Sequence, residues 1–554
     1  MDDHFKRHGV RLQGNTLVSA KHIEPGTTVL SQQALASVPQ PSIRGQRCNY
    51  CLSKASLQCC SRCRSAYFCS NDCFRNAWLQ FHRVLCEPQE YDIYGDGVDA
   101  DRWLLERAAL TLHSHNRLSK HHSHSPPHLP LAIKALDSLA SSPNLSSSPQ
   151  KSTTTLSLSS SSLSAGASDA PEQSAPQTTT TTTTTTKEVD FDAVSRYLEP
   201  YGCHYTKEQL DDLWQKVQKA TFDIVDHDQY LDTIALGIYP LTTLYVRHSC
   251  RPNSGIVYKR GVQHLIALDD IPLGEPITIS YVDLLQSKAE RMQQLRQRFG
   301  PDFECHCARC QGEYAILDDL LGASEEERPG YDEAELERQC QTWNVLNMVK
   351  AYQTISTPRV LDASNYTHYT SRIMAPDIYT PGTSSPTRNH HHSSNSSGSD
   401  SRLHFIAKET KVMTAKKVVP TLIALSQVPS VPAFTLQSLR AARKLLRRLI
   451  SESRWVEASR CALYLFVTYR LVYPTLHPTL SYHSLIVARS SWNSLVQLEL
   501  AGIGRKLERI YENGVQTWIV IARESVYYTF GQETNLWREI VELQWVFERD
   551  QKLK

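Results

Sequence analysis

The chain has 554 residues, more than one compact domain usually holds, so we expect three or four units. Its formal net charge of +2 is too small to indicate a nucleic-acid or membrane partner by itself. No apolar run reaches the length of a membrane span, and the polar start at Met1 does not resemble a signal peptide.

The 15 cysteines point to a reducing compartment. Most of them cluster at spacings typical of metal ligands, which in a chain without a secretory signal favours metal over disulfides. We therefore expect this protein in the nucleus and cytoplasm, without a membrane association.

Residues 1–43 are predicted to form strands joined by turns. Gly14 and Asn15 are a turn signal, and Pro25-Gly26 precede the β-rich run Thr27–Leu30. Taken alone, the Gly14-Asn15 pair indicates an ordinary turn as readily as a ligand-binding turn.

Residues 44–90 contain seven thiols and one imidazole at zinc-ligand spacing. Because zinc takes four such ligands, the set predicts two tetrahedral sites. A redox Cys-x-x-Cys would require only one or two pairs, so zinc is the better interpretation. Cys59, beside Cys60, is the one ambiguous ligand. The eight candidates are Cys48, Cys51, Cys60, Cys63, Cys69, Cys73, His82 and Cys86.

Helical and low-complexity segments follow. Residues 91–113 carry helical periodicity, as in Trp103-Leu104-Leu105. Residues 114–187 are rich in His, Ser, Pro, Leu and Thr and end in a Thr tract, a composition that cannot bury a core, so we expect a disordered and dispensable insertion. Regular structure is predicted to resume in residues 188–312, with helices over 193–198 and 207–220.

The end of that segment has short strands and a second group of thiols. Val257-Tyr258, Leu265–Leu268 and Pro276–Tyr281 read as strands, with a turn at Gly274-Glu275. Three thiols lie within six residues, too close for three separate disulfides, and a fourth can come from earlier in the chain. Four thiolates make a closed structural zinc site, here Cys250, Cys305, Cys307 and Cys310.

The rest of the chain is predicted to be mostly helical. Residues 313–372 are expected to be helical, residues 373–404 to form a disordered linker, and residues 405–554 to be a helical domain with apolar residues at helical spacing. The remaining thiols fit as ordinary buried side chains, namely Cys203, Cys340 and Cys461.

The segment from residue 247 to residue 310 resembles the catalytic half of a SET domain, the fold of protein-lysine methyltransferases. That family's signature is Asn-His-Ser-Cys-x-Pro-Asn, then a Gly-Glu-x-Ile-x-Ile-x-Tyr strand, then a Cys-x-Cys-x-x-Cys tail. The chain departs from it at Arg247, where the family has Asn. The matching positions are His248, Ser249, Cys250, Pro252, Asn253, Gly274, Glu275, Tyr281, Cys305, Cys307 and Cys310.

The cysteine-rich segment in turn resembles a MYND finger. By that resemblance the two zinc sites interleave and the family register selects Cys60. The ligands are then Cys48, Cys51, Cys69 and Cys73 for one ion, and Cys60, Cys63, His82 and Cys86 for the other. A SET domain interrupted by a MYND finger is typical of the SMYD family, of which this chain resembles a divergent or fungal-type member. The implied fold is α+β: a β-rich SET domain, split by the finger and followed by a tetratricopeptide-like helical domain.

The resemblance also implies site residues. Tyr281 stands at the position of the catalytic tyrosine, and S-adenosylmethionine and three structural zinc ions are the expected cofactors. Thr16 takes the place of a second Gly in the family's cofactor-binding turn. The expected cofactor contacts are Gly14, Asn15, Arg247, His248, Tyr281 and Phe303, and the expected substrate channel contains Thr221 and Phe222.

Arg247 leaves two alternatives open. If its guanidinium points inward, about 5 Å from the cofactor's sulfonium, it repels that charge by roughly 3 kcal/mol at an effective dielectric of 20. If it points outward, only the backbone of His248 matters.

The expected partners are proteins with an accessible lysine, and the protein is expected to be a monomer. The finger would also bind proline-rich peptides. Between Ser42 and Glu87, seven Lys/Arg against two acidic residues give a formal +5, which the thiolates of both zinc sites reduce to about +2. That charge suits only weak contact with DNA.

Two functions remain at this stage. The first is an active lysine methyltransferase acting on histone or other proteins, favoured by Tyr281, His248 and the complete zinc ligands. The second is a catalytically weak scaffold that binds partners through the finger and the helical domain, favoured by Thr16 and Arg247.

Overall fold

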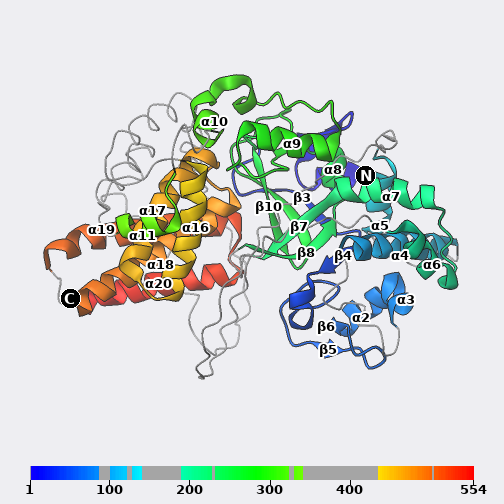
Figure 1. The fold of residues 1–554 in the computed structure, drawn as a ribbon, viewed down its shortest axis with the longest axis horizontal. Coiled ribbons are helices and arrows are strands. Elements are labelled where there is room, and N and C mark those ends of the chain that lie inside the picture. Colours follow the sequence, from blue (N-terminus) through cyan, green and yellow to red (C-terminus); the bar gives the residue numbers. More distant parts are fainter. Residues whose placement is uncertain are drawn as a thin grey trace, which may run out of the picture.

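The computed structural model describes residues 2–86, 100–120, 128–139, 189–226, 231–322, 330–340, 435–501 and 505–553. Within these ranges the predicted α+β architecture is confirmed: small sheets lie at the centre, a cysteine-rich finger on one side and a helical domain on the other (Figure 1). The expected linker at 373–404 falls outside the described residues.

Small sheets form the middle of the molecule. Strands β1 and β2 make an antiparallel hairpin, and β9 pairs in parallel with β12. Two three-stranded sheets have the orders β10-β11-β3 and β4-β8-β7. The strands are β1 Val10–Gln13, β2 Thr16–Ser19, β3 Thr28–Gln33, β4 Ser37–Pro39, β7 Thr221–Asp226, β8 Asp232–Ile238, β9 Arg247–His248, β10 Ser254–Lys259, β11 Val262–Ala267 and β12 Thr278–Ile279.

The sheets bring distant parts of the sequence together. Strand β3 lies beside β11, and β4 lies beside β8, so the segment before the finger completes sheets whose other strands come much later. The finger, with β5 (Gln58–Cys59), β6 (Tyr67–Phe68), α2 (Asn71–Ala77) and α3 (Arg83–Leu85), is therefore an insertion into one folded unit. A buried ion pair between Arg47 and Asp226 ties the finger to the end of β7.

Helices cover the sheets. Helices α4, α6 and α7 pack on one another, and their apolar residues form a common core with those of the finger. Helix α7 begins at a capping box in which Thr206 and Gln209 bond reciprocally. The bounds are α1 Asp2–Lys6, α4 Ala100–Lys120, α5 Leu129–Asp137, α6 Phe191–Leu198, α7 Lys207–Ala220, α8 Pro240–Tyr245, α9 Lys288–Phe299, α10 Ala315–Gly322 and α11 Glu333–Cys340.

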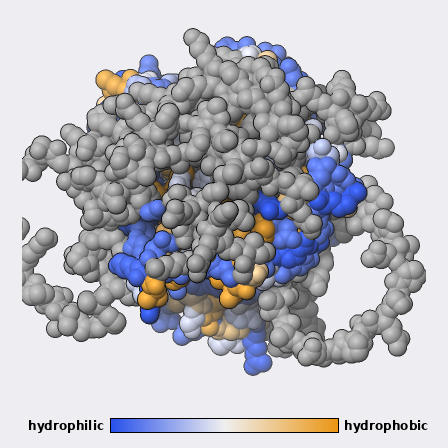
Figure 2. All heavy atoms as spheres, turned by 90° about the vertical axis from the view of Figure 1, so that its left-hand side faces the viewer, coloured by the Kyte–Doolittle hydropathy of each residue, from blue (hydrophilic) through white to orange (hydrophobic). Residues whose placement is uncertain are grey.

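The C-terminal helices form the second half of the molecule. Consecutive helices pack against each other from α16 to α20, and Cys340 and Cys461 are buried among them, as is Cys203 in the other core. Seen from this side (Figure 2), hydrophobic side chains of the described residues lie in small groups between hydrophilic ones. The helices are α16 Leu436–Ser451, α17 Trp455–Val472, α18 Pro478–Leu500, α19 Arg505–Thr529 and α20 Asn535–Leu553. None of the described helices combines the length and apolarity needed to cross a membrane.

One expectation from composition is wrong. Helix α4 continues to Lys120 and α5 lies inside residues 114–187, which were expected to be disordered throughout. Helix α5 packs against α7 and α8 and buries Ala132, Ala135 and Leu136. The short apolar run Leu129–Leu136 is amphipathic, and the His/Ser/Pro-rich residues around it hide that pattern. At least this part of the insertion belongs to the core.

Leu136→Ala is expected to destabilise the protein by about 2–5 kcal/mol, because Leu136 is 1% exposed and its removal leaves a cavity. Lys134→Ala, on the exposed side of the same helix, serves as the control and should change little. Urea unfolding followed by circular dichroism measures both. Equal midpoints for the two variants would show that α5 does not support the core.

Candidate active site and zinc sites

The finger holds two four-ligand clusters with the predicted interleaved pairing. Cys48, Cys51, Cys69 and Cys73 form one, and Cys60, Cys63, His82 and Cys86 form the other, with the ligand atoms of each within 4.8 Å of one another. Neighbouring ligand atoms are 3.5 to 3.8 Å apart. A zinc tetrahedron with bonds of about 2.3 Å places sulfurs about 3.8 Å apart, so both clusters fit that ion. Cys59 is exposed and belongs to neither.

Two turns of the same kind shape these clusters. Leu52 and Arg64, each directly after the second Cys of a Cys-x-x-Cys pair, adopt positive φ values of 61° and 55°. Each donates its backbone N–H to the carbonyl of the first Cys of the pair, at 2.9 Å. This tight turn brings both sulfurs to the same side, although the left-handed conformation is uncommon for such residues.

The third cluster joins the segment around His248 and Cys250 to the cysteine-rich tail. Cys250 lies within 4.8 Å of Cys305, Cys307 and Cys310, and its Sγ is 3.6 Å from that of Cys310. All four positions fit a closed structural zinc site. Three ligand clusters are therefore present, as the sequence predicts.

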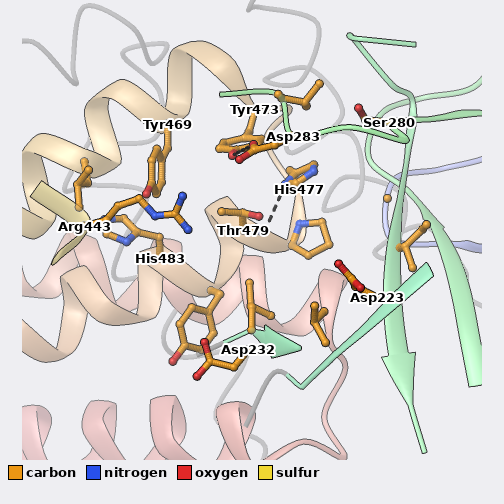
Figure 3. A pocket seen from close by; sticks show the side chains of 18 of the residues that line it. Asp223, Asp232, Ser280, Asp283, Arg443, Tyr469, Tyr473, His477, Thr479 and His483 are labelled. Carbon is orange, nitrogen blue, oxygen red and sulfur yellow. Dashed lines mark hydrogen bonds between the residues drawn. The ribbon is translucent and has the colours of Figure 1, made fainter. Parts of the chain in front are cut away.

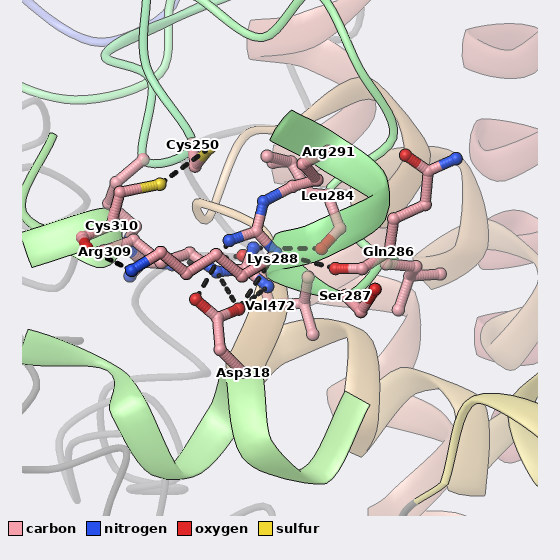
Figure 4. A network of polar contacts seen from close by, with 12 residues as sticks. Cys250, Leu284, Gln286, Ser287, Lys288, Arg291, Arg309, Cys310, Asp318 and Val472 are labelled. Atoms are coloured by element: carbon pink, nitrogen blue, oxygen red, sulfur yellow. Dashed lines mark hydrogen bonds and ion pairs between the residues drawn. The ribbon is translucent and has the colours of Figure 1, made fainter. Parts of the chain in front are cut away.

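A network of buried charges surrounds the third cluster (Figure 4). The Asp318 carboxylate accepts two hydrogen bonds from Arg291, both at 2.9 Å, and two from Arg309, at 3.0 and 2.8 Å. Lys288 donates to the carbonyl of Cys310 at 2.8 Å. The three side chains at the centre of the network are at most 8% exposed. A single carboxylate thus holds two buried guanidiniums beside the zinc ligands.

Elemental analysis of the purified protein is expected to return three zinc ions per chain. Cys250→Ser and Cys60→Ser should each lower the content by one, because each removes a ligand from a different cluster. Cys59→Ser should keep all three, because Cys59 lies outside the clusters. Loss of an ion from Cys59→Ser, or a content of two in the wild type, would contradict the ligand assignment.

Asp318→Asn is expected to destabilise the protein by about 3–5 kcal/mol, since it leaves two buried guanidiniums without a counter-charge. Asp319→Asn makes the same change on an exposed neighbour and should be nearly neutral. Denaturant unfolding compares them. If both variants unfold at the wild-type midpoint, the buried network contributes nothing to stability.

Tyr281 lies just after the short strand β12. Its hydroxyl donates to the carbonyl oxygens of Thr242 and Val246, at 2.9 and 3.0 Å, around the end of α8. Its backbone N–H donates to Nδ1 of His248 at 3.2 Å, which leaves Nε2 facing Cys250 Sγ at 3.3 Å. Burial raises the pKa of the Tyr281 phenol above its usual value and lowers the pKa of His248 to about 4. Both groups are therefore neutral near pH 7.

Tyr281 belongs to a cluster of aromatic rings. Its ring centroid is 5.6 Å from that of Phe222 and 5.1 Å from that of Phe299, and Phe299 is 5.1 Å from Phe303. His248 completes the cluster at 6.2 Å from Tyr281 and 6.3 Å from Phe303. The structure brings together four side chains named from sequence and adds Phe299. Phe299 could have been named from the sequence, because it lies only four residues before Phe303.

The predicted cofactor-binding residues come from three segments that meet at the edge of this cluster. Gly14 and Asn15 form the β1–β2 turn, where Gly14 has φ +59° and faces open space. Arg247 is exposed, and its Nε donates to the Thr16 hydroxyl at 2.9 Å. The two positions at which the chain departs from the SET pattern are thus bonded to each other. Arg247 points outward but is held at the turn.

Thr221 and Phe222, which were predicted to line the substrate channel, make different contacts. The Phe222 ring joins the aromatic cluster, whereas the Thr221 hydroxyl donates back to the carbonyl of Val217 in α7 at 2.7 Å. The Thr221 carbonyl accepts a hydrogen bond from Arg298, a residue that sequence analysis did not identify.

A cavity of about 370 Å³ lies beside this cluster, between the sheets and helices α16 to α18 (Figure 3). Asp223 and Ser280, the neighbours of Phe222 and Tyr281, line it on one side, and Asp232 and Asp283 add carboxylates. The helical side contributes aromatic and basic groups, including Arg443, Tyr469, Tyr473 and His483. Both halves of the molecule thus form the wall of one space.

Comparison with known proteins agrees with this arrangement. The MYND finger family model matches residues 48–86. The chain is 27% identical over 328 residues to histone-lysine N-methyltransferase SMYD3 of Homo sapiens, covering 56% of this chain and 62% of that protein. It is 24% identical over 299 residues to N-lysine methyltransferase SMYD2 of Bos taurus, covering 54% and 58%. The chain thus spans less than two thirds of the length of either relative.

A further relative aligns over most of both chains. Histone-lysine N-methyltransferase ASHR1 of Arabidopsis thaliana is 23% identical over 499 residues, covering 87% of this chain and 85% of that protein. Several relatives at low identity thus carry the same kind of name, and the matched finger is a separate finding that agrees with them. The matched finger and the similarity to these methyltransferases support a protein of the SMYD type, with SET and MYND domains.

Proposed function

We propose that the protein is a protein-lysine N-methyltransferase that uses S-adenosylmethionine. The observation that carries the proposal is the Tyr281 hydroxyl, bonded to two backbone carbonyls and enclosed by aromatic rings. The relatives named as lysine methyltransferases support the same reaction class.

Tyr281 orients the reacting groups. Because burial raises its pKa, the phenol keeps its proton near neutral pH and is not a general base. Its hydroxyl and the carbonyls of Thr242 and Val246 form a small polar patch within apolar rings. A lysine amine placed there would meet hydrogen-bond acceptors in a fixed geometry, and such positioning can contribute several kcal/mol.

The rings favour the neutral amine, which is the form that can accept a methyl group. A free lysine has a pKa near 10.4, so its deprotonation at pH 7 costs roughly 4 to 5 kcal/mol. Removal of the amine from water lowers that pKa, since desolvation penalises the charged form. Phe222 and Phe299 provide the apolar surroundings.

The β1–β2 turn and the start of β9 would hold the cofactor, through Gly14, Asn15, Arg247 and His248, with Phe303 on the far side of the ring cluster. When bound there, S-adenosylmethionine would supply an electrophilic methyl group. The open space at Gly14 and the bond between Thr16 and Arg247 fit such a ligand, since they bring both backbone segments to one place.

A lysine-containing segment of a protein would approach through the cavity between the two halves. The carboxylates of Asp223, Asp232 and Asp283 suit basic residues beside the lysine, on a histone or another protein. The finger would contribute peptide binding, including proline-rich segments, with at most weak contact to DNA. We extend the proposal to a monomeric protein of the nucleus and cytoplasm.

Incubation of the purified protein with tritiated S-adenosylmethionine and a cell extract or histones tests the reaction directly. Transfer of label to protein lysines is the expected result. Cofactor binding without any transfer would instead favour a scaffold that recruits partners through the finger and the helical domain.

Tyr281→Phe is expected to lower turnover by roughly a hundredfold or more while cofactor affinity stays nearly unchanged, because only the positioning hydroxyl is lost. Tyr205→Phe is the matched control, since it also removes one hydroxyl bonded to a backbone carbonyl, that of Ala109, away from the site. Near-normal turnover of Tyr281→Phe would place the positioning role elsewhere.

A further inference from the structure

A positive charge already lies against the aromatic cluster. The guanidinium carbon of Arg298 is 4.6 Å from the centroid of the Phe222 ring, 5.0 Å from that of Tyr281 and 6.0 Å from that of Phe299. Cations within about 6 Å of a ring centroid are attracted to the ring face. One guanidinium therefore interacts with three of the rings that surround the Tyr281 hydroxyl.

Arg298 is anchored in this position. It is the next-to-last residue of α9, and its side chain reaches across to the junction between α7 and β7. There its Nε donates to the carbonyl of Lys219 at 3.1 Å and its Nη2 to the carbonyl of Thr221 at 2.8 Å. Among the described residues Arg298 has no ion pair within 4.0 Å, but the Asp223 carboxylate is close enough to interact with it electrostatically. Carbonyl oxygens, ring faces and this carboxylate therefore surround its charge.

We propose that Arg298 is an internal competitor of the substrate lysine and thereby a specificity-determining residue of this site. The inference rests on the proposed function, which places a lysine side chain among the same rings. The ring faces that would attract an alkylammonium ion are already used by the guanidinium. Two like charges about 5 Å apart also repel each other, even at an effective dielectric of 20. The site therefore discriminates against a charged alkylamine and admits the neutral amine more readily.

The test uses n-butylammonium as a probe of the lysine side chain and n-butanol as its uncharged counterpart. Ligand-observed NMR at pH 7.5 measures both affinities without any need for transfer. Arg298→Gln keeps a polar side chain that can bond the same carbonyls but carries no charge. It is expected to bind n-butylammonium at least tenfold more tightly than the wild type, with n-butanol binding changed less than twofold.

Three controls separate this effect from others. Arg296→Gln makes the same charge change on the exposed side of α9 and should give no gain. Adding Phe222→Ala to Arg298→Gln should abolish the gain, because it removes the nearest ring. Arg298→Met, a second uncharged variant, should reproduce the gain, and three zinc ions per chain confirm that each variant is folded.

A gain in n-butylammonium binding that depends on Phe222 supports the proposal. No gain in either folded Arg298 variant, whether the wild type binds the probe or not, overturns it, as does an equal gain in Arg296→Gln. These outcomes are independent of catalysis. A failure of the labelled-cofactor assay together with the binding gain would remove the methyltransferase proposal and leave Arg298 as a competitor for cations at the ring cluster.

Discussion

The third zinc cluster is the constraint on which the arrangement of the site depends. Cys250 follows His248 by two residues, and the other three ligands come from the segment directly after α9. One ion here would fix the segment that follows β9 against the segment that carries Phe303. The contact between His248 and Phe303 in the ring cluster joins the same two segments.

Positively charged side chains lie near the negatively charged third zinc cluster. Four thiolates around a divalent ion carry a net charge of −2. Arg291 and Arg309 bring two buried positive charges and Asp318 one buried negative charge, which leaves a formal charge of −1 with the site's −2. The exposed Lys288 adds a positive charge near the Cys310 carbonyl. A buried group of charges is tolerated when they are paired and hydrogen-bonded, as they are here.

The same region connects the two halves of the molecule. Cys250 and Cys310 share one apolar core with the helices from α16 to α20. Arg251 donates to the carbonyl of Val472 at the end of α17, and the hydroxyl of Tyr473 donates to Asp283, two residues after Tyr281. The C-terminal helices are therefore packed directly against the segment that carries Cys250 and Arg251. These contacts hold together the two halves that line the cavity.

Much of this site could be predicted from sequence, since metal chemistry and motif spacing are local. Zinc fixes the separation of its ligands, so the spacing indicates the ligand positions, while the family resemblance was needed to pair them into interleaved sites and to choose Cys60 over Cys59. Helix α5 was missed because an eight-residue apolar run is short beside the biased composition around it. Arg298 and the bond between Thr16 and Arg247 were missed for another reason. They are contacts between segments distant in sequence, and no periodicity or spacing encodes which side chains meet.

Thr16 and Arg247, the two departures from the SET pattern, are explained together by the hydrogen bond between them. A Gly at position 16 would give Arg247 no hydroxyl to bond, and an Asn at position 247 would be shorter than the guanidinium that reaches Thr16. The bond turns the Arg247 side chain along the β1–β2 turn and away from the ring cluster, so its charge lies at the rim of the proposed cofactor site. Arg298 lies against the rings of Phe222 and Tyr281. One guanidinium is thus held at the β1–β2 turn and the other lies against the rings, while the Tyr281 phenol and the His248 imidazole are neutral near pH 7. The Arg298 charge, 5.0 Å from the centroid of the Tyr281 ring, disfavours a second positive charge there, and this favours a neutral amine in the proposed reaction.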